Sequence, residues 1–243
     1  MPNSASYHMY PCGDHAVTIE LGNKVNAAIN QKVISLFSYL KDQSIHGVKD
    51  IIPAYHTLTI VYDTALLRKK ITTTTVYEWV CGQIQKAIEN CKMAIAKTPA
   101  LVRIPVCYDL SLAPDLKTLA AAHQIGIDEV IQWHTGKSYR VYMIGFLPGF
   151  AYMGSVHEKI STPRKASPRT LVPGGSVGIA GEQTGIYPFD SPGGWQLIGQ
   201  TPIAIFNIHK TQPCLLQPGD EVTFYPISLT EFQKMKDHEP AHS

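Results

Sequence analysis

The sequence predicts two domains: an α+β domain over residues 1–98, with the order β-β-α-β-β-α, and a mainly-β domain over residues 99–243. Two observations predict this division. In the first part, apolar residues recur at helical spacing in two long segments. In the second part, residues 145–202 hold 11 of the 18 glycines and 7 of the 17 prolines, which is typical of short strands joined by tight turns. The boundary is expected at Thr98-Pro99.

The first domain is built from two strand pairs, each followed by a helix. Apolar or alternating runs predict strands at residues 7–10, 16–21, 48–54 and 57–62. Apolar faces of period 3.6 predict helices at 25–41 and 73–97, and threonines just before the second helix are suitable N-caps. This order favours a small sheet with both helices on one face.

The second domain opens with a strand at 101–106 and two short helices at 114–123 and 127–135. After residue 139 the pattern becomes all-β, with short apolar runs at 141–144, 176–180, 203–208 and 221–225, and a last helix is expected at 228–236. Many short strands separated by turn residues predict a barrel or a sandwich.

The composition excludes several classes of protein. Charged residues make up only 16% of the chain, against roughly 25% in an average soluble domain, which suggests that a partner covers part of the surface. The net charge of +2 argues against a nucleic-acid binder. No apolar run reaches the roughly 18 residues of a membrane span, and the first ten residues do not resemble a signal peptide, so a cytoplasmic protein is expected. Five scattered cysteines without a C-x-x-C pair indicate free thiols rather than disulfides or a zinc site.

Glycines alternate with aromatic residues in the segment GFLPGFAYMG at 145–154, directly after a predicted strand. Glycine permits positive φ and a close approach of the backbone to a ligand. Phe146, Phe150 and Tyr152 would then form an apolar wall beside exposed backbone amides. The alternative is a tight loop whose aromatic side chains fill the end of the barrel, and both interpretations remain open.

A basic segment, PRKASPRT at 163–170, places three cations close together with no acid between them. Two prolines restrict its backbone, and the planar guanidinium of arginine suits carboxylate or phosphate. The alternative is a flexible, solvated loop, but the two prolines favour anion binding at Arg164 and Arg169, with Lys165 facing solvent.

Polar but uncharged residues within 183–196 are expected to line a pocket and orient a small ligand by hydrogen bonds. The alternative for Trp195 is an ordinary core residue. His134 ends one apolar face of the 127–135 helix, so it is either a core or cap residue or a general acid–base. Motifs of zinc proteases, α/β-hydrolases and P-loop proteins do not occur in the sequence.

Three segments carry a specific resemblance: YRVYMIGFLPGFAYMG (139–154), TPRKASPRTLVPGGSVGIAGEQTGIYP (162–188) and SPGGWQLIGQTP (191–202). Together with shorter matches over nearly the whole chain, they resemble the family of the 5-oxoprolinase B-type subunits, also described as allophanate hydrolase subunit 1 and kinase A inhibitor. The family often has arginine where this chain has Gln200, which removes one cation from the expected edge of the site. The resemblance implies a cyclophilin-like β-barrel for residues 99–243.

The resemblance also implies an activity, the ATP-dependent opening of 5-oxoproline to glutamate, performed together with a homologous C-type subunit and a separate A-type subunit. ATP would be held by the assembled complex, and no metal site is evident. The catalytic candidates are His134, Arg164 and Arg169. The expected substrate-binding residues are Gly145, Phe146, Pro148, Gly149, Phe150, Tyr152, Gln183, Thr184, Tyr187, Gly193, Gly194, Trp195 and Gln196.

Two other functions are compatible with the resemblance. Family members are also described as inhibitors of a sensor histidine kinase, and such a role requires an exposed protein-binding face. Related modules form half of a carboxyltransferase in urea carboxylase-type enzymes, where a separate biotin carrier would be needed. The barrel itself does not decide between these functions.

Overall fold

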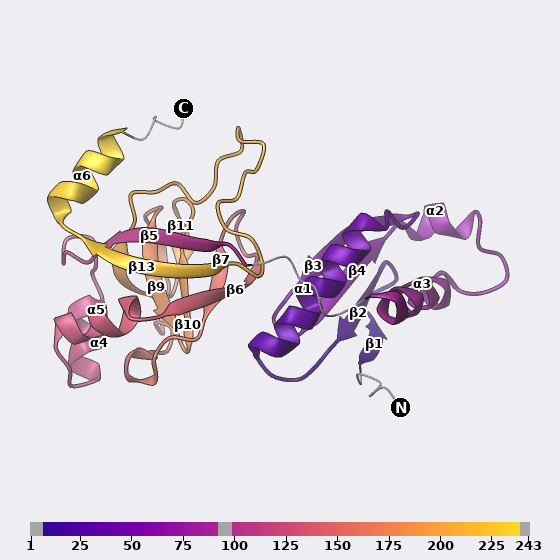
Figure 1. Cartoon of the computed structure of the whole chain (residues 1–243), viewed down its shortest axis with the longest axis horizontal. Helices are drawn as coiled ribbons and strands as arrows, with labels where there is room; N and C mark the ends of the chain where they lie inside the picture. Colours follow the sequence, from indigo (N-terminus) through magenta and orange to yellow (C-terminus); the bar gives the residue numbers. More distant parts are fainter. Residues whose placement is uncertain (1–6, 92–98, 239–243) are drawn as a thin grey trace. The chain divides into compact units, whose positions relative to one another are not determined.

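The computed structural model describes residues 7–91 and 99–238. The chain divides into two compact units, Met1–Thr98 and Pro99–Ser243, which are labelled by element in Figure 1. The α+β followed by mainly-β fold class is confirmed, with a closed barrel in the second unit.

The first unit contains an antiparallel sheet of order β1-β2-β4-β3, formed by His8–Pro11, Ala16–Glu20, Thr57–Tyr62 and Val48–Pro53. Alternate residues of β4 are buried, as expected for a sheet with one covered face. Helices α1 (Ala27–Asp42) and α3 (Val76–Asn90) pack against each other and the sheet, and their apolar faces join one core. The end of the predicted 73–97 helix lies outside the described residues.

Local capping explains where these helices begin. The side chain of Asn26 accepts hydrogen bonds from the amides of Ala28 and Ile29 at the start of α1. At α3, the Thr75 hydroxyl accepts from the Glu78 amide at 3.1 Å while the Glu78 carboxylate accepts from the Thr75 amide at 3.1 Å, which is a capping box. A short helix, α2 (Thr64–Arg68), was not predicted from the sequence.

The second unit is a closed barrel of order β10-β7-β6-β13-β5-β12-β9. Its strands are β5 (Leu101–Cys107), β6 (Ser138–Ile144), β7 (Ala151–Gly154), β9 (Ser176–Ala180), β10 (Gln183–Ile186), β12 (Gln196–Gln200) and β13 (Glu221–Ile227). The ladders are antiparallel except for β13 and β5, which pair in parallel over their full length.

Helices α4 (Leu116–Ala122) and α5 (Ile127–Thr135) pack against each other, and their apolar side chains join the barrel core. Outside the barrel, β8 (Arg169–Val172) and β11 (Ser191–Gly193) form a separate two-stranded sheet. A 3-10 turn, η1 (Glu158–Ile160), and a last helix, α6 (Leu229–His238), complete the unit.

The strand expected at 203–208 is wrong. In this segment the Ile203 amide donates to the Thr201 hydroxyl at 3.3 Å, and Phe206 makes only an isolated bridge with Cys214. Hydroxyl side chains compete for backbone amides in this way and favour turns over a continuous ladder.

Candidate functional site

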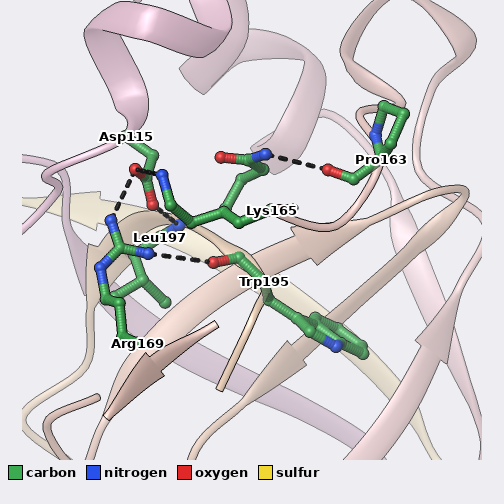
Figure 2. Close-up of polar contacts among 7 residues, drawn as sticks. Asp115, Pro163, Lys165, Arg169, Trp195 and Leu197 are labelled. Carbon is green, nitrogen blue, oxygen red and sulfur yellow. Dashed lines mark hydrogen bonds and ion pairs between the residues drawn. The ribbon is translucent and has the colours of Figure 1, made fainter. Parts of the chain in front are cut away.

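A buried carboxylate lies at the centre of the basic segment. Asp115, whose side chain is 6% exposed, accepts from Arg169 Nη2 at 2.6 Å and from Lys165 Nζ at 3.1 Å on the same oxygen, Oδ1. Its other oxygen, Oδ2, accepts from the Leu197 amide at 2.7 Å. Figure 2 shows the carboxylate held between these donors. Asp115 precedes α4 but makes no side-chain bond to the first turn of that helix.

This arrangement differs from the prediction for Lys165 and shows which group Arg169 contacts. Lys165, expected to face solvent, is bound to Asp115 and its side chain is 33% exposed. Arg169 does bind a carboxylate, as expected of an arginine in this segment, but the carboxylate belongs to the chain itself. Asp115 was not predicted from the sequence because it lies 50 residues before Lys165 and 54 before Arg169. In addition, a single aspartate at the start of a helix is typical of an N-cap.

Electrostatics keep Asp115 ionised. Burial acts to raise the pKa of its carboxyl, but hydrogen bonds from Arg169, the Leu197 amide and Lys165 outweigh burial and lower the pKa below its ordinary value. A carboxylate of this kind is a fixed negative charge at neutral pH, and it compensates part of the positive charge of the segment.

Backbone and side-chain bonds hold the 163–169 segment along the start of β12. The Lys165 amide donates to the Gly194 carbonyl at 2.8 Å. The Pro163 carbonyl accepts from Gln196 Nε2 at 2.9 Å, the bond drawn at Pro163 in Figure 2. The Arg169 guanidinium also reaches the Trp195 carbonyl at 3.5 Å. The predicted site residues Arg169, Gly194, Trp195 and Gln196 are therefore brought together.

The Arg164 guanidinium lies 5.9 Å from the centre of the Trp195 ring, within the range of a cation–π contact, and Arg164 is exposed. Its charge acts to lower the pKa values of Tyr152 and Tyr187, although burial is the larger effect and raises both. Arg164 therefore lies beside the aromatic residues that the sequence analysis grouped with it.

Those aromatic residues form a packed cluster rather than an open wall. Phe150, Tyr187 and Trp195 are each less than 5% exposed. The Phe150 ring meets Tyr152, Tyr187 and Trp195 edge-on, with centres 4.9 to 5.3 Å apart, the geometry that the ring quadrupole favours. For Phe150 and Trp195 the structure favours the alternative of core packing over an open apolar wall, and Tyr187 is packed in the same cluster. Tyr152 is half-buried and Phe146 is 62% exposed.

The glycine–aromatic loop uses part of its own backbone. The Gly145 amide donates to the Phe150 carbonyl at 3.1 Å, and the Phe150 amide to the Leu147 carbonyl at 3.0 Å. Pro148 is exposed and has no amide hydrogen. Within Gly145–Gly149, the amide of Gly145 is therefore used inside the loop and Pro148 offers none. Gly149 has a φ of +83° and packs so closely on Phe206 that a Cβ would lie 2.8 Å from its Cβ.

Phe146 has a φ of +71°, which is a strained backbone conformation for a bulky residue. Its ring nonetheless contacts Phe150 edge-on at 5.6 Å between centres. This exposed and strained aromatic is a feature that sequence pattern alone did not indicate.

His134 and Thr184 form a separate network inside the barrel. Thr184 Oγ1 donates to the Gly178 carbonyl at 3.1 Å, so it accepts from His134 Nε2 at 3.0 Å. His134 Nδ1 then accepts from the Tyr108 hydroxyl at 2.7 Å. Burial lowers the pKa of His134 to about 3. The structure favours the core-histidine interpretation, since a fully enclosed neutral imidazole with both nitrogens bonded cannot exchange protons with a ligand.

The remaining candidates have defined places. Gln183 is half-buried on β10 and pairs with Gly154 and Ala180. Gly193 lies against the Tyr187 phenol, with no room for a Cβ. Gln200, where the family often has arginine, is buried and donates to the Gly174 carbonyl at 2.6 Å.

Residues 7–91 and 99–238 hold neither a metal-ligating cluster nor a membrane-spanning helix. Within these ranges, three or more His, Cys, Asp or Glu side chains do not gather closely enough to hold a metal ion. Among the helices of those same ranges, none has the length and apolar character of a membrane span.

Comparisons with known proteins identify relatives over most of the chain. The family model "Carboxyltransferase domain, subdomain C and D" matches residues 7–216. The chain is 39% identical over 233 residues to the B-type subunit of 5-oxoprolinase from Bacillus subtilis, covering 95% of this chain and 97% of that protein. It is 37% identical over 217 residues to the corresponding 5-oxoprolinase protein of Escherichia coli O157:H7, covering 89% and 94%. Urea amidolyase of Saccharomyces cerevisiae is 28% identical over 262 residues, which cover 93% of this chain and 13% of that protein.

Solved structures also match this chain. The crystal structure of TTHA0988 matches with a TM-score of 0.76 at 32% identity and covers 88% of this chain, which spans 40% of the length of TTHA0988. The conserved uncharacterized protein PH0987 from Pyrococcus horikoshii matches with a TM-score of 0.54 at 39% identity, covering 93% of this chain and all of that one. With the family model and two near-full-length relatives in agreement, the chain belongs to the family of 5-oxoprolinase B-type subunits, within the group of carboxyltransferase domains of subdomains C and D.

Proposed function

We propose that this chain is the B-type subunit of an ATP-dependent 5-oxoprolinase and that it converts 5-oxoproline to glutamate together with A- and C-type subunits. One observation carries the proposal: the 39% identity with the B-type subunit of Bacillus subtilis 5-oxoprolinase extends over 97% of that protein. The low charged fraction of 16% supports a chain whose surface is partly covered in a complex.

The chemistry explains why ATP is needed. The lactam of 5-oxoproline is stabilised by resonance, so water adds to its carbonyl carbon slowly. If the lactam oxygen first attacks the γ-phosphorus of ATP, ADP leaves and the ring carbon becomes electrophilic. Water then adds to that carbon and the ring C–N bond breaks with a proton passing to nitrogen, which gives an acyl phosphate of glutamate. A second water displaces phosphate from this acyl phosphate, so that glutamate, ADP and phosphate are the products. In this proposal the assembled complex binds the ATP.

The site on this chain supports a role in binding an anion. Arg164, Lys165 and Arg169 carry three positive charges and Asp115 carries one negative charge, so the cluster remains positive. The cations lie on a segment held to β12 by hydrogen bonds, and a fixed array of donors binds an anion with little reorganisation. His134, enclosed in the barrel core, takes no part in this proposal.

The test is reconstitution. The three subunits are co-purified, and 5-oxoproline-dependent phosphate release is measured together with glutamate formation. We expect both products in equal amounts, and neither when this chain is left out. A well-formed complex that releases no phosphate on addition of 5-oxoproline would overturn the proposal.

A carboxyltransferase role is the second candidate, because the matched family model is described as a carboxyltransferase domain and urea amidolyase is a relative over 93% of this chain. The same complex, supplied with a carboxylated biotin carrier and urea, would then transfer the carboxyl group to urea. This outcome, with no turnover of 5-oxoproline, would favour the second function. The kinase-inhibitor alternative stays a prediction.

A further inference from the structure

Building on the proposed 5-oxoprolinase function, we propose a division of labour within the basic segment. Arg164 binds the carboxylate of 5-oxoproline, and Asp115 is a positioning residue that binds Lys165 and Arg169 and fixes the segment that carries Arg164.

The first argument is the charge balance of the segment. Asp115 lies within ion-pair distance of Lys165 and Arg169. Arg164 is in none of the ion pairs found among the described residues, and its contact there is the face of the Trp195 ring. Of the three neighbouring cations, the guanidinium of Arg164 is therefore the one left for a charge supplied by a ligand.

The second argument is the rigidity of the backbone around Arg164. The residue before it, Pro163, has a fixed φ, and its carbonyl accepts from Gln196. The residue after it, Lys165, donates its amide to Gly194 and its ammonium to Asp115. An arginine held on both sides loses less conformational freedom when it binds a ligand than one on a free loop.

The third argument concerns the class of ligand. One uncompensated guanidinium matches a singly charged carboxylate, which it can hold through two parallel hydrogen bonds. The triphosphate of ATP carries several charges and is typically cradled by many backbone amides, whereas the Gly145 and Phe150 amides are bonded within their own loop. Tyr152 and Phe146, both in edge contact with Phe150, offer apolar surface suited to a small ring.

The test uses the three-subunit complex and compares Arg164→Gln with Arg103→Gln. Arg103 is a matched control because it is also an exposed arginine of the barrel, with its guanidinium 5.2 Å from the Tyr225 ring centre. We expect Arg164→Gln to raise KM for 5-oxoproline by about 10- to 100-fold, the range for loss of a charge-assisted hydrogen-bonded pair, with kcat and the KM for ATP nearly unchanged. Arg164→Lys should restore part of the affinity, and Arg103→Gln should change none of these values.

The positioning role of Asp115 has its own readout. Asp109→Asn, at an exposed aspartate that accepts from the amide and hydroxyl of Ser111, should leave KM for 5-oxoproline unchanged. Asp115→Asn should raise KM for 5-oxoproline, as Arg164→Gln does. A merely structural residue would instead lower the amount of active complex and leave the KM of the remaining enzyme unchanged.

Equilibrium binding separates failure of this inference from failure of the proposed function. Calorimetric titration of the wild-type complex with 5-oxoproline should show binding that Arg164→Gln weakens by the same factor as its KM. If wild type binds and turns over but Arg164→Gln matches it, or if only the KM for ATP rises, the assignment of the carboxylate to Arg164 is wrong while the function stands. If the wild-type complex neither binds nor consumes 5-oxoproline, both are wrong.

Discussion

Replacing Asp115 by asparagine tests how much the buried carboxylate contributes to the barrel. Asparagine keeps the shape, and its oxygen can still accept from the Leu197 amide, but the charge opposite Arg169 and Lys165 is lost. Removing one partner of a buried ion pair costs about 3–5 kcal/mol. The cost is smaller here because the Arg169 and Lys165 side chains are 24% and 33% exposed and regain hydration. We expect the free energy of unfolding to fall by about 2–3 kcal/mol.

Urea unfolding at pH 7, followed by circular dichroism, measures this loss. The control is Asp109→Asn, since Asp109 is an exposed aspartate that also accepts bonds from a neighbour, here the amide and hydroxyl of Ser111. Its substitution should have a much smaller effect. An Asp115→Asn protein as stable as the Asp109→Asn protein would refute the reasoning.

The pH dependence adds a second check with a defined sign. The pKa of Asp115 is lowered in the folded state, so its stabilisation is complete above the unfolded pKa of about 3.9. The stabilisation is lost as the pH falls through the folded value. The difference in stability between wild type and Asp115→Asn should therefore be constant from pH 5 to pH 7 and shrink below pH 4.

Three further predictions test other parts of the structure. Because the pKa of His134 is lowered to about 3 in the folded state, only the unfolded state binds a proton at this residue below about pH 6.5. The free energy of unfolding should therefore decrease by about 1.4 kcal/mol for each unit by which the pH falls. His134→Gln should flatten this slope in urea titrations from about pH 4.5 to 7, and equal slopes for the two proteins would contradict the prediction. Gly193→Ala should lower the free energy of unfolding by about 1–3 kcal/mol, because the new Cβ would collide with the Tyr187 phenol. Gly82→Ala in helix α3, where nothing lies within 4 Å of the new Cβ, should instead raise it by about 0.5–1 kcal/mol. A higher melting temperature for Gly193→Ala than for Gly82→Ala would contradict the packing described here. Phe146→Gly should raise the melting temperature above that of Phe146→Ala, because glycine alone relieves the φ of +71°, and equal values would show that the strain is not there.

Local rules in the sequence determined much of the architecture. Helical periodicity with a capping pair such as Thr75 and Glu78 needs only neighbouring residues, so α1 and α3 were predictable. The dense glycines and prolines of 145–202 likewise predicted short strands, which the closed barrel confirms. The strand prediction for 203–208 failed because this apolar run forms an isolated bridge, between Phe206 and Cys214, and not a continuous ladder.

Tertiary structure decided the chemistry of the candidate site. From the sequence, Arg164 and Arg169 were expected to bind an anion and Lys165 to face solvent. Barrel closure instead brings Asp115, 50 residues before Lys165, into contact with both Lys165 and Arg169. The same closure buries Trp195 and encloses His134. Burial and long-range pairing are properties of the assembled core, and the free energy of a charge or an aromatic ring depends on that environment. Residue types alone therefore predicted an anion site in this segment, and only the fold distinguished the paired cations from the exposed one.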